Sequence, residues 1–251
     1  LALRLAVFAN LVDIGRIDGL RGCREEDGAV WVGATTTEAS IESDPGIARS
    51  VPLLARATPY IGHFQIRNRG TLGGSLAHAD PAAEYPAVAL TLDATMAVTS
   101  SRGPREIPAA AFFEGHWTTA MDPDELLIGA YFPVWTGRCG FAIHEFARRH
   151  GDFALAGATV AVEIDGADRV RRCAIGLIGL GPTPSRPDAL EAEICGRNPA
   201  ELDPVELGHE AVGDLESVPS DLHGPAEYRK RVGAAMVGRA WAAAVEEAKR
   251  G

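Results

Sequence analysis

The apolar residues of the chain follow two kinds of spacing. Short runs rich in β-branched and aromatic residues, bounded by Gly, Pro, Asp or Ser, predict β-strands at residues 29–34, 94–101, 105–108, 127–132, 140–149, 154–164 and 170–180. Apolar residues at helical spacing predict helices at residues 35–41, 52–62, 109–114, 188–195, 204–212 and 226–249. A further helix is expected to begin at Pro81, with Asp80 as its N-cap.

The order of these elements predicts an α+β fold in two parts. Short strands and helices are mixed up to residue 135, whereas three long strands and then three helices follow it. The strands at 154–164 and 170–180 alternate and carry β-branched residues, which is typical of an antiparallel sheet. The segment WTGR, residues 135–138, separates the two parts. We therefore expect domains at residues 1–135 and 136–251.

The most informative stretch is RNRGTLGGSL, residues 67–76. Its three glycines, Gly70, Gly73 and Gly74, allow the backbone to turn tightly and approach another molecule, and Thr71 and Ser75 add hydroxyl groups. Consecutive free N–H groups in such a turn form a concave site for an anion such as phosphate. The stretch lacks the Gly-Lys-Ser/Thr of a P-loop and the Gly-x-Gly-x-x-Gly of a dinucleotide fold. A plain turn between two helices, with no ligand, is the alternative.

Composition excludes several classes of function. The 251 residues carry a formal net charge of −10, and an acidic chain repels the phosphate backbone of nucleic acids. The four cysteines lack the Cys-x-x-Cys spacing of iron–sulfur and zinc sites. No apolar run reaches the roughly 18 residues of a membrane helix, so we expect no transmembrane segment and no signal peptide.

No group of side chains indicates self-contained catalysis. The seven histidines are scattered without metal-ligand spacing, and neither a serine nucleophile motif nor a catalytic pair of carboxylates stands out. Any chemistry is therefore expected to come from a cofactor, which the protein would bind and orient. Arg67 and Arg69 are candidate phosphate partners, with solvated or acid-paired side chains as the alternative.

The longer string IRNRGTLGGS (residues 66–75), followed by AHADP (77–81), resembles the FAD-binding medium subunits of molybdenum hydroxylases, the family of carbon monoxide dehydrogenase and xanthine dehydrogenase. Four further stretches agree with that family and occur in its order: LVDI (11–14), GATTT (33–37), DELL (124–127) and RRHGDFA (148–154). Each is short, but the set is specific and covers nearly the whole chain.

The resemblance implies a particular fold. Residues 1–135 would form an FAD-binding domain of the PCMH type, with two α/β subdomains, and residues 136–251 a domain with a three-stranded antiparallel sheet and helices. In the family a first glycine-rich motif precedes the position of Leu1, and the sequence given lacks it. We therefore expect the first subdomain to be truncated and half of the pyrophosphate cradle to be missing, through either a fragment or an omitted N-terminus.

The resemblance also implies an activity and partners. The chain would be the flavoprotein subunit of an oxidoreductase, a heterotrimer that forms dimers, in the cytoplasm or at the inner face of the membrane. A small subunit with two [2Fe-2S] clusters would pass electrons to FAD on this chain, and FAD would pass them to an external acceptor. A large subunit would hold the molybdenum cofactor and the substrate, so the substrate and the acceptor stay open.

The residues implied in FAD binding are Ile61, Thr71, Leu72, Gly73, Gly74, Ser75, His78, Glu84, Leu126 and Phe153. Those from Thr71 to Ser75 would surround the pyrophosphate, and the others would lie near the sugar or the ring. No catalytic side chain and no metal ligand is implied. Purely structural alternatives exist: Glu84 at a helix N-terminus, and Leu126 and Phe153 in a core.

Two other functions remain open from the sequence. The chain could be a scaffold that docks the other subunits without FAD, which the absent first motif would favour. It could also be a stand-alone FAD oxidase of the same superfamily. FAD content would separate the scaffold from the electron-transfer subunit, and co-purifying iron–sulfur and molybdenum subunits would exclude the oxidase.

Overall fold

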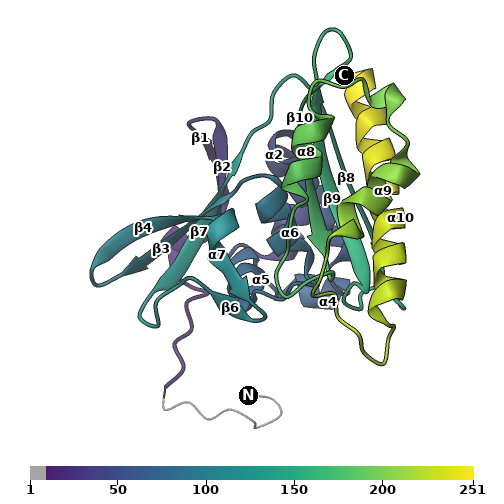
Figure 1. The fold of residues 1–251 in the computed structure, drawn as a ribbon. Coiled ribbons are helices and arrows are strands. Elements are labelled where there is room, and N and C mark those ends of the chain that lie inside the picture. Colours follow the sequence, from purple (N-terminus) through teal and green to yellow (C-terminus); the bar gives the residue numbers. More distant parts are fainter. Residues whose placement is uncertain (1–9) are drawn as a thin grey trace.

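The structure, a computed structural model, describes residues 10–251, so the start of the predicted first domain, including Leu1, lies outside the described residues. It contains a five-stranded sheet, a three-stranded sheet and a two-stranded hairpin, with helices around both larger sheets (Figure 1). None of the helices in the described part is long and apolar enough to cross a membrane.

The five-stranded sheet is antiparallel, in the order β1-β2-β7-β3-β4. Its strands are β1 (Cys23–Glu26), β2 (Ala29–Gly33), β3 (Thr95–Ser100), β4 (Gly103–Pro108) and β7 (Leu126–Pro133). Successive side chains of a strand point to opposite faces. Val30 and Val32 therefore enter the main core, whereas Trp31 packs on Tyr131 on the other face, with 4.7 Å between ring centroids. The four strand predictions in this region are confirmed.

Short helices cover the core face of this sheet. They are α1 (Glu38–Ser43), α2 (Pro45–Ser50), α3 (Pro52–Ala57), α4 (Phe64–Arg67), α5 (Leu72–His78), α6 (Glu84–Thr91) and α7 (Ala109–Phe112). Helix α5 packs on β2 and β7. Every residue of α6 is buried, because this helix lies between the two larger sheets.

Three helix predictions need correction. The helix expected at 52–62 ends at Ala57 and continues only as a tighter turn, Thr58–Tyr60, which contains Pro59. The helix expected to begin at Pro81 begins at Glu84, and Asp80 instead accepts a hydrogen bond from the Ala82 amide, at 2.9 Å.

Pro86 explains the later start of α6. In a helix that begins at Glu84, Pro86 is the third residue, and a backbone N–H at this position has no carbonyl acceptor within the helix, so its absence in proline costs no hydrogen bond. Counted from Pro81 it would fall in the helix interior. Residues 11–14 have no regular structure, and the first helical turn of the described part is Asp18–Leu20.

The predicted helix at 109–114 is cut short by a hairpin. Helix α7 ends at Phe112, and the next residues form β5 (Phe113–Gly115), which pairs with β6 (Thr118–Thr119). Strand β6 lies against α5, so the hairpin borders the glycine-rich helix.

The second sheet has the order β10-β9-β8 and is antiparallel, as predicted. Its strands are β8 (Arg138–Phe146), β9 (Ala156–Ile164) and β10 (Val170–Ile178), followed by helices α8 (Asp188–Ile194), α9 (Pro204–Gly213) and α10 (Ala226–Arg250). All nine residues of the central strand β9 are buried. The long helix α10 covers one face of the sheet, and α3 and α6 cover the other (Figure 1).

Side chains of the two parts therefore share a core. Phe141 and Ile143 of β8 belong to the same apolar cluster as the first sheet. Arg56 on α3 pairs with Glu247 on α10, with 2.6 Å between Nη2 and Oε1. The hydroxyls of Thr91 and Thr159 meet at 2.6 Å in the buried contact between α6 and β9.

Candidate functional site

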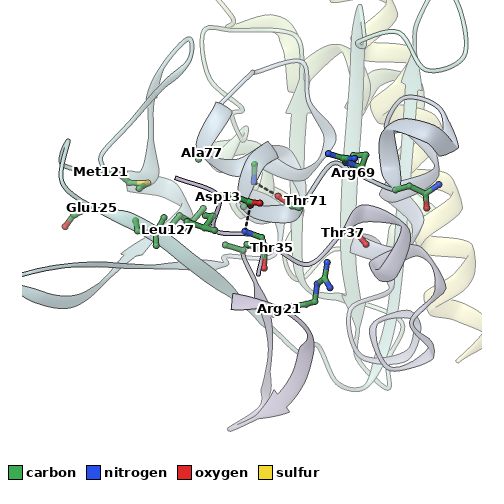
Figure 2. Close-up of a pocket in the computed structure, with 17 residues that line it drawn as sticks. Asp13, Arg21, Thr35, Thr37, Arg69, Thr71, Ala77, Met121, Glu125 and Leu127 are labelled. Atoms are coloured by element: carbon green, nitrogen blue, oxygen red, sulfur yellow. Dashed lines mark hydrogen bonds between the residues drawn. The ribbon is translucent and has the colours of Figure 1, made fainter. Parts of the chain in front are cut away.

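The main candidate site is a cavity of about 580 Å³ beside the N-terminus of α5 (Figure 2). Pockets of this size accept cofactors and other small ligands. Its walls come from the segment before the first sheet, the β2–α1 loop, the glycine-rich stretch and the start of β7. The lining residues are Asp13, Ile14, Gly15, Arg21, Ala34, Thr35, Thr37, Asn68, Arg69, Thr71, Gly73, Gly74, Ala77, Met121, Glu125, Leu126 and Leu127.

The glycine-rich stretch forms a helix N-terminus rather than an open turn. Thr71 is the N-cap of α5, and its Oγ1 accepts a hydrogen bond from the Gly74 amide at 3.1 Å. A Cβ added at Gly73 would lie 2.5 Å from the Cβ of Ala34, so glycine is required for α5 to approach the β2–α1 loop. A Cβ added at Gly74 would meet only Thr71 Oγ1, at 3.0 Å.

The expected row of free amides is wrong. The Leu72 amide donates to the carbonyl of Thr36 at 3.1 Å, and the Gly73 amide donates to the carbonyl of Ala34 at 2.9 Å. The Gly74 amide is used by the cap, and the Ser75 amide donates to the Thr71 carbonyl at 3.0 Å. These four donors hold α5 against the β2–α1 loop and itself, so they are not available to an anion.

Other donors face the cavity instead. Thr37 and Thr71 face each other in an isolated bridge between the two loops, and its hydrogen bonds run from the Glu38 amide to the Gly70 carbonyl and from the Leu72 amide to the Thr36 carbonyl. The amides of Thr37 and Thr71 themselves donate to no residue in the range 10–251. The guanidinium groups of Arg21 and Arg69 line the cavity, and neither forms an ion pair within that range. Two cationic side chains therefore remain available for a negatively charged ligand.

The two arginines of the stretch have different roles. Arg67 pairs with Glu42 at 2.8 Å and also donates to the carbonyls of Ile61 and Gly62, so it fixes the local fold. Arg69 lines the cavity. The sequence could not separate them, because two arginines two residues apart look alike without knowledge of where α4 ends.

The far end of the cavity is apolar. Leu126 is half-buried there, whereas Leu127 is buried and also belongs to the main core. Met121 completes this end from the loop before β7. This end suits a flat, apolar ring, and the donors at the other end suit phosphate.

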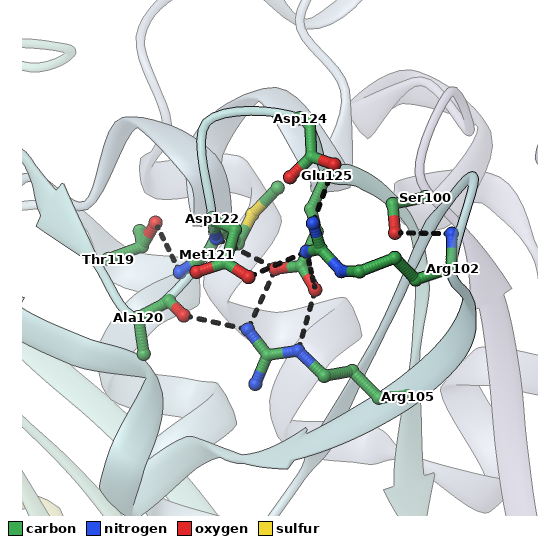
Figure 3. A network of polar contacts seen from close by, with 9 residues as sticks. All are labelled: Ser100, Arg102, Arg105, Thr119, Ala120, Met121, Asp122, Asp124 and Glu125. Carbon is green, nitrogen blue, oxygen red and sulfur yellow. Dashed lines mark hydrogen bonds and ion pairs between the residues drawn. The ribbon is translucent and has the colours of Figure 1, made fainter.

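A network of charged residues fixes the loop that carries Met121 (Figure 3). Arg105 on β4 pairs with Glu125, with 2.6 Å between Nε and Oε1, and also donates to the carbonyl of Ala120. Arg102 pairs with Asp122 and Asp124 from the β3–β4 turn. Hydrogen bonds from Arg105 hold the pKa of Glu125 at about 2, so this carboxyl stays ionised.

Three carboxyl groups are withdrawn from solvent: Glu38 and Glu84 are buried, and Glu145 is half-buried with its Oε2 atom covered. Glu38 and Glu84 are the first residues of α1 and α6, and Glu145 comes from β8. Burial raises the pKa of Glu38 and of Glu84 to about 7 and that of Glu145 to about 8. The Oε2 atoms of Glu38 and Glu145 are buried and have no hydrogen-bond partner among the described residues.

The ten residues predicted for the site are only partly brought together. Thr71, Gly73, Gly74 and Leu126 line the cavity, whereas Leu72 is fully buried in the core and Ser75 points elsewhere on α5. The others lie around it: Ile61 precedes α4, Glu84 is buried at the start of α6, and His78 is exposed at the end of α5.

Phe153 lies in a separate depression of about 350 Å³ and is 61 % exposed. Its loop contacts the segment before α4, because a Cβ added at Gly151 would lie 3.0 Å from Gly62. The buried-ring alternative for Phe153 is therefore wrong.

Sequence reasoning missed several lining residues, among them Asp13, Arg21, Asn68 and Met121. Thr35 and Thr37, from the family-like stretch GATTT, also line the cavity, and Thr37 is the N-cap of α1. For Asn68 a signal was available, because this polar residue lies within the glycine-rich stretch itself. No signal in the sequence places Arg21 there, because its position depends on the packing of the first loop.

Comparison with known proteins agrees with this architecture. Residues 1–135 match the family model described as the FAD binding domain in molybdopterin dehydrogenase, and residues 141–244 match the CO dehydrogenase flavoprotein C-terminal domain. The chain is 38 % identical to the 6-hydroxypseudooxynicotine dehydrogenase complex subunit alpha of Paenarthrobacter nicotinovorans, over 99 % of this chain and 84 % of the relative. It is 34 % identical to the carbon monoxide dehydrogenase medium chain of Hydrogenophaga pseudoflava, over 96 % and 84 %.

Solved structures show the same fold. Carbon monoxide dehydrogenase from Hydrogenophaga pseudoflava, in a form that lacks the Mo-pyranopterin moiety of the molybdenum cofactor, matches with a TM-score of 0.93 and 35 % identity, covering 98 % of this chain and 85 % of that one. Quinoline 2-oxidoreductase from Pseudomonas putida 86 matches with a TM-score of 0.91 and 32 % identity, with the same coverage. The chain belongs to the family of FAD-binding medium subunits of molybdenum hydroxylases.

Proposed function

We propose that this member of the molybdenum hydroxylase medium-subunit family transfers electrons within a heterotrimer. Electrons from substrate oxidation at a molybdenum site on a large subunit would pass through two [2Fe-2S] clusters of a small subunit to FAD on this chain. FAD would then deliver them to an external acceptor. The observation that supports this role is the cavity beside α5, which combines anion donors with an apolar end.

The residues of the cavity fit FAD. A dinucleotide needs donors for its pyrophosphate, and Arg21, Arg69 and the two amides of Thr37 and Thr71 supply them. The isoalloxazine ring needs a flat apolar surface, and Met121 and Leu126 supply one. When bound, FAD supplies the electron chemistry, because it is reduced by two electrons and then reoxidised.

The chain's own residues bind and orient. Gly74 leaves the mouth of the cavity open, and Gly73 holds α5 in place against the β2–α1 loop. The network around Arg105 fixes the loop of Met121, so the apolar wall is formed before the ligand enters. No side chain is required as an acid or base.

We place the sugar and adenine of FAD near Ile61, Glu84 and Phe153, beyond the cavity. The support is the pair of buried carboxyl oxygens without a partner, Glu38 Oε2 and Glu145 Oε2, close to Glu84. Buried acceptors of this kind are costly unless a donor satisfies them, and sugar hydroxyls are suitable donors. We place His78 at the rim of the ring end and Leu72 and Ser75 behind the pyrophosphate.

We also propose the division at residues 135/136 and assembly into a dimer of heterotrimers. The separate apolar cluster formed by the second sheet, α9 and α10 supports the division. The four cysteines form no disulfide in the described part, which supports a reducing compartment such as the cytoplasm or the inner face of the membrane.

The test is to produce the complex from its natural operon and to measure FAD, iron and molybdenum per heterotrimer. We expect one FAD per copy of this chain, released on its denaturation, and reduction of that FAD by substrate through the clusters. A complex with iron and molybdenum but no FAD, and no FAD uptake, would instead support the scaffold. FAD with no partner subunits would support the stand-alone oxidase.

A further inference from the structure

The tip of the β5–β6 hairpin carries an exposed tryptophan beside the cavity. The side chain of Trp117 is 62 % exposed, which is unusual for so large an aromatic residue. The other three tryptophans are covered: Trp31 and Trp241 are buried, and Trp135 lies under the guanidinium of Arg172, 3.7 Å from its ring centroid.

The backbone at this position is strained. Trp117 has a φ of +56°, in the left-handed region that bulky residues avoid. Glycine would relieve this strain, so the folding of the hairpin does not by itself favour tryptophan here. Strain of this kind persists where surrounding contacts fix it, and it gathers at functional sites.

Two hydrogen bonds hold the ring in one orientation. The Trp117 backbone amide donates to the carbonyl of Ala79 at 3.2 Å, and the indole Nε1–H donates to Oδ2 of Asp80, also at 3.2 Å. The ring of His78 stacks on the indole, with 6.0 Å between centroids and 17° between planes. His116 flanks it at 4.3 Å. The indole is therefore exposed and also fixed.

This stack borders the ring end of the cavity. His78 ends the helix α5, whose Gly74 and Ala77 line the cavity, and Met121 lines it two residues after β6. A flat molecule on the indole would thus lie next to the place proposed for the isoalloxazine ring.

We propose that Trp117 and His78 form a stacking platform for the ring of the external electron acceptor, and that this acceptor is a quinone. The inference rests on the proposed function, since the quinone must reach reduced FAD. A flat, uncharged ring matches an exposed indole face. The carboxylate of Asp80 beside the platform disfavours the pyrophosphate of a nicotinamide dinucleotide, because like charges repel.

The electron balance of this step is complete. The quinone accepts two electrons and two protons from reduced FAD and leaves as the hydroquinone, and FAD returns to its oxidised form. No further oxidant is needed on this chain.

Tryptophan fluorescence tests the platform without activity. The FAD-free subunit and the FAD-loaded complex are titrated with menadione, and acrylamide serves as a quencher that cannot stack. We expect saturable quenching by menadione with unchanged fluorescence lifetime, lost in Trp117→Phe. Trp135→Phe removes an indole remote from the stack and is the matched control, so its saturable quenching should remain.

Three outcomes would overturn the platform. One is quenching that rises linearly without saturation, and another is the same saturable quenching in Trp117→Phe. The third is that FAD itself quenches Trp117 and prevents quenching by menadione, which would assign the stack to the cofactor. Because FAD content is measured separately, a failed platform leaves the proposed function intact.

Kinetics of the complete enzyme give a second, independent measurement. We expect Trp117→Ala to raise the KM for menadione by about three- to tenfold, the loss expected for one ring contact. The rate at which substrate reduces FAD, and the FAD content, should not change. Trp117→Phe keeps an aromatic ring and should stay near the wild-type KM. An unchanged KM in Trp117→Ala would refute the proposal.

Discussion

Gly73 and Gly74 are neighbours in α5, but the structure predicts opposite consequences for adding a methyl group to each. At Gly73 the new Cβ would lie 2.5 Å from Ala34 Cβ and 2.7 Å from the Ala34 carbonyl oxygen. At Gly74 it would meet only Thr71 Oγ1, at 3.0 Å, and would otherwise project into the cavity. Gly73→Ala therefore tests the fold, and Gly74→Ala tests the site.

The magnitudes follow from these contacts. Overpacking at Gly73 costs about 1–3 kcal/mol, and loss of its hydrogen bond to Ala34 costs about 1 kcal/mol more. The helix preference of alanine offsets about 1 kcal/mol. We expect a net destabilisation of about 1–3 kcal/mol. At Gly74 the gain in helix preference and the disturbed Thr71 cap, each about 1 kcal/mol, nearly cancel.

Urea unfolding and FAD titration separate the two effects. Gly73→Ala should lower the free energy of unfolding of the FAD-free subunit with an unchanged m-value. Gly74→Ala should keep that free energy within about 1 kcal/mol of wild type but weaken FAD binding by about tenfold or more, since its methyl group occupies space in the cavity. Wild-type stability in Gly73→Ala would refute the packing, and wild-type FAD affinity in Gly74→Ala would refute the cavity as the cofactor site.

Four further variants test the charges. Arg69→Gln should weaken FAD binding and reduce the salt dependence of that binding, without a change in the free energy of unfolding. Arg67→Gln should lower the free energy of unfolding by about 1–3 kcal/mol, because it leaves Glu42 and the carbonyls of Ile61 and Gly62 unpaired. The reverse pattern would contradict the roles assigned to the two arginines. Burial raises the pKa of Glu145 to about 8 from its ordinary value of 4.5, so the folded protein holds this proton more tightly than the unfolded chain. The stability that this bound proton contributes is complete below about pH 4.5 and is lost as the pH rises through 8. Glu145→Gln should therefore gain stability relative to wild type between pH 5 and pH 9, measured by thermal unfolding. The same change of melting temperature with pH in both proteins would contradict the burial of this carboxyl. Glu125→Gln should release the loop at 119–125, seen as faster limited proteolysis there. Because the pKa of Glu125 is lowered to about 2, the stability from its pairing is present above about pH 4.5 and is lost as the pH falls towards 2, where variant and wild type should converge.

Much of the fold could be predicted from the sequence, because the spacing of apolar residues within each segment determines whether it forms a strand or a helix. Seven of the ten strands in the described residues, and the three C-terminal helices, follow from apolar patterns, whereas the short strands β1, β5 and β6 were missed. The failures have identifiable causes. The start of α6 was misjudged because Asp80-Pro81 is a strong N-cap signal, whereas Pro86, five residues later, decides the start. The burial of β9 on both faces depends on α10 and α6, which are distant from it in the sequence.

The site was less predictable because its members are joined by packing and not by spacing. Thr71, Gly73 and Gly74 follow from the motif, but Arg21 and Met121 reach the cavity from loops that no local signal connects to it. The strain at Trp117 is likewise invisible in the sequence, since nothing in the tripeptide around it requires a positive φ.

The sequence of the glycine-rich stretch indicated the right family, but the role expected for its backbone amides was wrong. Its amides were expected to hold phosphate, yet those of Leu72, Gly73 and Gly74 bind the β2–α1 loop or the Thr71 side chain. In the proposed site, Arg21 and Arg69 would therefore supply most of the attraction for an anion, with the amides of Thr37 and Thr71 beside them, in a chain whose net charge is −10. Binding through charge is screened by salt. It follows that FAD retention should fall as ionic strength rises, whereas a cradle of backbone amides alone would make it nearly insensitive.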